Sequence, residues 1–156
     1  MVSEKFPSIE DVLPHRGAML LVDSIESYDE TTITLSAKPK QNAWYSNQAD
    51  EMPAWIGIEL MAQAVAAWVG LTSKVHGLPV KRGVLLGTRS YVPAQAAFAV
   101  GVPLIIKAAP IYQDESGMGS FHCQIFQYDK CLVNAAINVF EPENFEIFLQ
   151  QRKKDD

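Results

Sequence analysis

One apolar run, from Met52 to Ser73, constrains this 156-residue chain more than any other feature. The two polar side chains near its start, Glu59 and Gln63, stand four residues apart, so they share one face of a helix. The surrounding side chains belong in a dry interior, where an unpaired carboxylate is costly. Glu59 is therefore a candidate general acid/base, and we expect its side chain to be buried. The residues alone leave equally open a structural carboxylate, held by a backbone donor or an arginine.

The same run raises the question of a membrane span, because residues 53–72 are nearly long enough to cross a bilayer. A carboxylate at membrane depth costs at least ~2.5 kcal/mol. Most of the remaining chain is predicted to form strands, which need a core to cover. The run is also rich in small residues, which suits close packing against other backbone. We therefore expect a core helix and no membrane partner.

Composition is typical of one globular domain over residues 1–156, with 48% hydrophobic and 20% charged residues. The net charge of −5, with no basic stripe, argues against a nucleic-acid partner. Cys123 and Cys131 lack metal-ligand spacing, so we expect free thiols, no metal and no cofactor. The first 14 residues contain no apolar segment like that of a secretory signal, which favours the cytoplasm.

Residue periodicity and turn signals predict an α+β chain with one long helix, over residues 53–75, and a short helix over residues 8–13. The expected strands are residues 19–28, 31–37, 82–92, 100–113, 117–128 and 131–141. A tight turn at Asp129-Lys130 is expected to join the last two strands. The chain after Pro142 is expected to form a short helix or a frayed tail. A six-stranded antiparallel sheet can wrap a central helix that lacks a polar face. This is the hotdog fold, and its open sheet edges favour dimerisation.

Two segments carry a resemblance to a known family. Residues 13–23, Leu-Pro-His-Arg-Gly-Ala-Met-Leu-Leu-Val-Asp, resemble the LPHR-x-P-x-LLVD opening of FabZ-type 3-hydroxyacyl-acyl carrier protein dehydratases. Residues 52–64, Met-Pro-Ala-Trp-Ile-Gly-Ile-Glu-Leu-Met-Ala-Gln-Ala, resemble that family's FPGVLILEAMAQA helix. Residues 53–63 are also similar to the ApeP-type subfamily, which is associated with aryl polyene pigment synthesis.

The resemblance implies roles for three residues. Glu59 takes the position of the catalytic acid, and Gln63 takes the polar position that steadies the site. Ala54 stands where the family has glycine, whose backbone N–H at the helix start holds the thioester carbonyl. The aromatic residues Trp44, Tyr45 and Trp55 have two interpretations from their residue types alone: they line an acyl tunnel, or they pack in the hydrophobic core.

The chain departs from the family at its catalytic histidine. FabZ-type enzymes carry that histidine in a Gly-His-Phe-Pro-Gly stretch before the helix, and the corresponding residues 42–51 contain none. Dehydration needs a base for the C2 proton and an acid for the leaving hydroxyl. His15 is one candidate base, against the alternative that it only belongs to a turn. His76 is expected to interact with the helix C-terminus, and His122 to pack within a strand.

The leading functional hypothesis is a 3-hydroxyacyl-acyl carrier protein dehydratase, a hydro-lyase of fatty-acid or aryl polyene synthesis that acts on acyl carrier protein thioesters. The alternatives are a hotdog acyl thioesterase, in which Glu59 activates water, and a non-catalytic acyl-carrier-binding partner. The chain is expected to be a homodimer or a heterodimer with a His-bearing dehydratase paralogue. The resemblance implies that each site takes its histidine from one subunit and its glutamate from the other. A homodimer without that histidine is therefore expected to be inactive.

Overall fold

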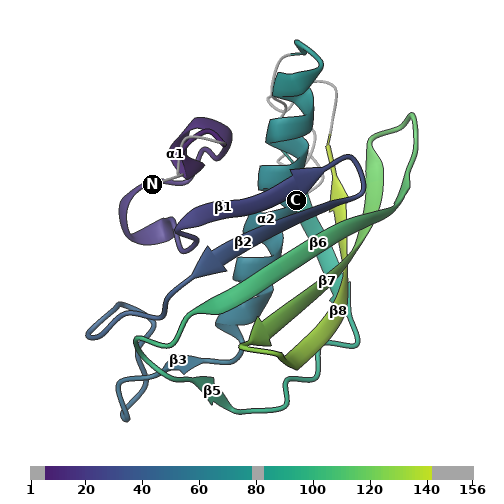
Figure 1. The fold of residues 1–156 in the computed structure, drawn as a ribbon. Helices are drawn as coiled ribbons and strands as arrows, with labels where there is room; N and C mark the ends of the chain where they lie inside the picture. The colour runs from purple at the N-terminus through teal and green to yellow at the C-terminus, as the bar shows by residue number, and fades with distance from the viewer. Residues whose placement is uncertain (1–5, 79–82, 142–156) are drawn as a thin grey trace, which may run out of the picture.

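The central element is the helix α2 (Ile56–Val75), which packs against one face of a six-stranded antiparallel sheet (Figure 1). The computed structural model describes residues 6–78 and 83–141. The order of the strands across the sheet is β1 (Ser24–Asp29), β2 (Thr32–Ala37), β6 (Leu104–Gln113), β7 (Met118–Gln127), β8 (Lys130–Phe140) and β4 (Val84–Arg89). The predicted hotdog architecture is confirmed.

Alternating residues of the inner strands form the sheet's half of the core. The register places Leu35, Ile106, Ile125 and Val133 in one row across β2, β6, β7 and β8, and all four are buried. Because strand side chains alternate between faces, such rows present a continuous apolar surface to the helix. The helix covers this surface with its own buried residues, among them Leu60, Met61, Ala64, Ala67 and Leu71.

The long helix begins three residues later than predicted. Met52 and Pro53 form the strand β3 (Met52–Pro53), which pairs with β5 (Ala97–Phe98) in a separate two-stranded sheet. That pairing holds residues 52–53 extended, so the first helical residue is Ile56. No sequence pattern predicted β5, because its two residues are too few to show alternation.

The segment before β1 also differs from its prediction. Residues 19–28 were expected to form one strand, but Gly17–Met19 make a 3-10 turn and β1 starts at Ser24. The backbone N–H of Leu21 donates to the side chain of Gln63 instead of a neighbouring strand. The short helix is present as α1 (Ile9–Val12), shorter than predicted, and the Ser8 side chain makes no capping bond.

The remaining boundaries shift by a few residues. The β7–β8 turn is Tyr128-Asp129, one residue before the expected position, and Tyr128 has a positive φ of 54°. The structure begins β4 at Val84 and ends it at Arg89, which is shorter than the predicted strand. The expectation for the chain after Pro142 falls outside the described residues.

By length and composition α2 passes as a membrane span, but 61% of its apolar 18-residue window is buried inside the fold, as in a core helix. The sequence predicts a sheet that wraps α2 on nearly every side, and this prediction is wrong. One stripe of the helix stays only half-buried and forms the floor of a groove: Glu59, Ala62, Ala66 and Val69.

Candidate active site

A groove of about 500 Å³ runs along the half-buried stripe of α2. The N-terminal segment, residues 10–16, lines one part of it, and residues 83–85 with Val139 of β8 line another. The floor is apolar except at Glu59, which lies in the first turn of α2. The groove therefore combines space for an apolar chain with a single helix carboxylate.

The carboxylate of Glu59 is accessible from the groove. Its side chain is 37% exposed in this chain, so the expectation of a buried Glu59 is wrong. The physical reason is that Glu59 belongs to the stripe that the sheet leaves uncovered. Glu59 Oε1 accepts a 3.0 Å hydrogen bond from Gln63 Nε2 and lies 3.7 Å from His15 Nε2.

Gln63 is the one buried polar side chain of the described core. Its Oε1 accepts from the backbone N–H of Leu21 at 3.0 Å, and its Nε2 donates to the carbonyl of Met19 at 2.8 Å as well as to Glu59. Buried amides of this kind are satisfied on both ends. Gln63 thus ties residues 19–21 to the helix and orients one oxygen of Glu59.

His15 meets Glu59 from the N-terminal segment. Its side chain is 26% exposed; Nε2 faces Glu59, whereas Nδ1 is buried and has no hydrogen-bond partner among the described residues. The side chain of Arg16 fixes the surrounding turn: Nη1 donates to the carbonyls of Leu13 (2.6 Å) and His15 (2.7 Å), and Nη2 donates to that of Glu10 (3.0 Å). The arginine of the Leu-Pro-His-Arg motif thereby holds the backbone of this turn in place.

At the start of α2, the backbone N–H of Ala54 is not free to hold a thioester carbonyl, as the resemblance had implied it would be. The N–H of Ala54 donates to the carbonyl of Ala96 at 2.9 Å, so it is already occupied by the small β3–β5 sheet. The N–H groups of Trp55 and Ile56 make no hydrogen bond within the described parts of the chain. The Trp55 side chain is exposed and does not line the groove, and Trp44 is likewise exposed, packed edge-on against the buried Tyr45.

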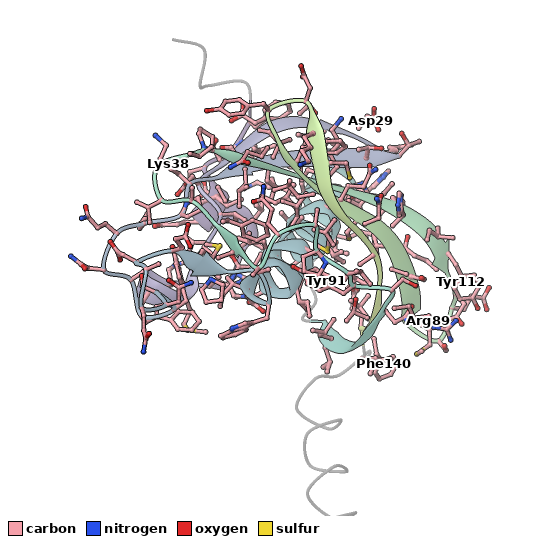
Figure 2. The ribbon with its side chains drawn as sticks, turned by 90° about the horizontal axis from the view of Figure 1, so that it is seen from below. Asp29, Lys38, Arg89, Tyr91, Tyr112 and Phe140 are labelled. Atoms are coloured by element: carbon pink, nitrogen blue, oxygen red, sulfur yellow. The ribbon has the colours of Figure 1, made fainter. Side chains whose placement is uncertain are left out.

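Tyr91 is a residue of this region that the sequence did not indicate. Its hydroxyl donates a short hydrogen bond to the carbonyl of Ala54, and burial raises the pKa of Tyr91 to about 12. A Cβ at Gly57 would collide with this hydroxyl, which explains glycine in the first turn of the helix. Figure 2 shows Tyr91 inward, beside the helix, whereas Arg89 and Tyr112 lie at the periphery. No local pattern could reveal a contact that joins a loop to a helix start 37 residues away.

The other histidines lie away from the groove lining. His76 Nε2 lies 3.5 Å from Glu30 Oε1 at the opposite end of α2, and the exposed His122 contacts Asn134 across β7 and β8 at 3.3 Å. Asp50 accepts from the N–H of Asn42 at 2.8 Å and so braces the loop before the helix. In residues 6–78 and 83–141 there is no cluster of three or more potential metal ligands.

The fold and the groove together define a hotdog-fold protein with a histidine and a glutamate side by side at an apolar floor. The particular family follows from sequence comparison. A sequence model of the ApeP-like family, described as ApeP dehydratase, matches residues 7–150. The chain belongs to this family, and the protein is a dehydratase.

Solved structures agree with this assignment. The ApeI:P dehydratase heterocomplex from Xenorhabdus doucetiae contains a chain with 27% identity and a TM-score of 0.86, over 94% of this chain and 98% of that one. A hypothetical thioesterase protein from Streptococcus pneumoniae, solved with coenzyme A, has 17% identity and a TM-score of 0.60 over 76% of this chain and 84% of its own. The protein smu.793 from Streptococcus mutans, bound to acetyl CoA, has 12% identity and a TM-score of 0.63 over 83% and 94%. The last two share the fold. A search of curated protein sequences gave no significant match.

Proposed function

We propose that this chain, as a single hotdog domain, dehydrates 3-hydroxyacyl thioesters of acyl carrier protein in fatty-acid or aryl polyene synthesis in the cytoplasm. The observation that carries the proposal is the position of Glu59, at one end of an apolar groove and oriented by a buried amide. The half-buried Ala62, Ala66 and Val69 suit an acyl chain laid along α2. The reaction is acid/base chemistry and needs no cofactor.

Glu59 acts as the general acid for the leaving hydroxyl. A catalytic acid must come within hydrogen-bond reach of the group that it protonates, and Glu59 is accessible enough for that. Its contacts to Gln63 and His15 both involve Oε1. Oε2 therefore remains for the 3-hydroxyl group of the substrate.

The start of α2 holds the thioester carbonyl. A helix N-terminus favours negative charge on oxygen, and this charge grows on the carbonyl as the C2 proton leaves. With the N–H of Ala54 bonded to Ala96, the donors in this role are the N–H groups of Trp55 and Ile56. Ala54 contributes through its carbonyl, which Tyr91 binds to fix the helix start.

We place a second dehydratase subunit along β4. This strand is an edge of the sheet and exposes Leu85 and Leu86, whereas the other edge, β1, exposes the polar residues Ser24, Glu26 and Asp29. An apolar open edge favours pairing with another chain. The Xenorhabdus structure, a dehydratase heterocomplex, supports a heterodimer. In such a pair, a His-bearing partner is one source of the base.

Mass spectrometry of acyl carrier protein loaded with a 3-hydroxyacyl group tests the function. The protein, alone and with a second dehydratase subunit, should convert the 3-hydroxyacyl species to the enoyl species, which is lighter by one water. Release of the free acid would instead indicate a thioesterase. Activity of the mixture that survives Glu59→Ala would favour a non-catalytic partner role for this chain.

A further inference from the structure

His15 lies opposite Glu59 in the groove, so a second acid/base group faces the carboxylate there. The two side chains come from segments 44 residues apart, yet Nε2 and Oε1 lie 3.7 Å from each other. Both residues line the same groove. A substrate bound above Glu59 therefore also meets the imidazole.

The backbone around His15 is held from both sides. Upstream, the carbonyl of Val12 packs so closely on α2 that a Cβ at Gly70 would lie 2.5 Å from its oxygen. Downstream, Gln63 binds the backbone of Met19 and Leu21. Between these two anchors the Arg16 guanidinium binds three carbonyls of the turn. Catalytic groups need this kind of preorganisation, since a displacement of about 1 Å is enough to impair catalysis.

The environment of the ring also distinguishes its two nitrogens. Nδ1 is buried and has no hydrogen-bond partner in the described structure, so no substrate reaches it. Nε2 faces Glu59. A neutral imidazole with its proton on Nδ1 then presents an unprotonated Nε2, which is the form that a general base requires.

We infer that His15 is the second catalytic residue of this site and removes the C2 proton of the substrate; the inference rests on the proposed dehydration. His15 Nε2 takes the proton, and the electrons of the C2–H bond form the C2=C3 double bond. The C3–O bond breaks, and the leaving hydroxyl takes the proton of the Glu59 carboxyl group and departs as water. The imidazolium then returns its proton to the adjacent Glu59 carboxylate, which restores both groups without any co-reactant.

If His15 is the base, the second subunit need not supply a catalytic histidine. The resemblance implied that the base must come from another subunit, because residues 42–51 contain no histidine. With His15 as base, one protomer contains both members of the pair. A second subunit then completes the walls of the groove and the sheet, and its histidine is not required for turnover.

The test compares His15→Gln and His15→Ala with wild type, each alone and with the second dehydratase subunit, in the carrier-protein assay. We expect kcat to fall about 10²–10⁴-fold in both variants, as for loss of a general base, with KM nearly unchanged. Added imidazole should restore part of the activity of His15→Ala, which a purely structural role would not allow. The matched control is His76→Gln, since His76 also faces a glutamate, 3.5 Å away, at the other end of the same helix.

The outcomes separate the inference from the proposed function. If the wild-type sample dehydrates the substrate and both folded His15 variants keep its kcat, His15 is not the base, and the dehydratase proposal stands. If wild type converts nothing in a sample that a FabZ-type enzyme does convert, the proposed function itself fails. If the variants unfold more easily, the assay is run below their melting temperature, where absence of imidazole rescue counts against the inference.

Discussion

The buried amide of Gln63 links Glu59 to the backbone of Leu21, through two hydrogen bonds of 3.0 Å each. One bond orients the carboxylate in the groove, and the other holds the N-terminal segment against α2. The position of Glu59 and that of the segment that carries His15 therefore depend on the same side chain.

Replacing Gln63 with leucine should lower both stability and activity. The Leu21 N–H and the Met19 carbonyl would lose their partner in a partly buried setting, where each unsatisfied group costs up to about 1–3 kcal/mol. We expect a decrease of about 1–3 kcal/mol in the free energy of unfolding, measured by urea denaturation. The exposed Gln113→Leu is the control and should stay within about 0.5 kcal/mol of wild type.

The variant Glu59→Gln should abolish dehydration while it leaves the fold intact. The amide keeps the shape of the side chain and an oxygen for Gln63 Nε2, but it cannot donate a proton as an acid. We expect kcat to fall about 10²–10⁴-fold and the melting temperature to stay close to that of wild type. Glu30→Gln, at the remote His76 pair, serves as control. Normal turnover by Glu59→Gln would remove this residue from the mechanism.

A methyl group at Gly70 should disturb the site from a distance. Alanine favours a helix over glycine by about 1 kcal/mol, but its Cβ would lie 2.5 Å from the backbone oxygen of Val12. The N-terminal segment must move away, and His15 moves with it. We expect Gly70→Ala to lower both melting temperature and kcat, whereas Lys74→Ala, in the exposed last turn of the same helix, should change neither.

The chain should associate through β4. A charge placed on this edge, as in Leu86→Asp, would have to be desolvated on pairing and should weaken the assembly. Analytical ultracentrifugation at micromolar concentration is expected to give an oligomer for wild type and a smaller species for the variant. The corresponding change on the other edge, Ser24→Asp, should have no effect. A wild-type species of 17.3 kDa would contradict the proposed association.

The two cysteines should differ in reactivity. Burial raises the pKa of the Cys123 thiol to about 12, so almost none of it is thiolate at pH 8, and the side chain is inaccessible. Cys131 is only partly buried. Titration with a thiol reagent should therefore modify Cys131 in the native protein and Cys123 only after unfolding. Equal rates for both thiols in native buffer would show that the core around β7 is open.

Local patterns in the chain were sufficient to predict most of the architecture. The apolar run without a polar face indicated a core helix, and the alternation in β2, β6, β7 and β8 predicted strands that cover it. These predictions succeed because side-chain periodicity is a local property. The predictions for the helix start and for residues 19–23 failed, because pairing with β5 and with Gln63 overrides local preference there.

By itself, the sequence determined that Glu59 and Gln63 share a helix face and that this helix is the core of a hotdog sheet. Only the tertiary structure decided that Glu59 is accessible in a groove, that the Ala54 N–H is taken by Ala96, and that His15 lies beside Glu59. The reason is physical. Helix faces and strand alternation follow from backbone geometry over a few residues, whereas exposure and acid/base pairing depend on how segments more than 40 residues apart pack together.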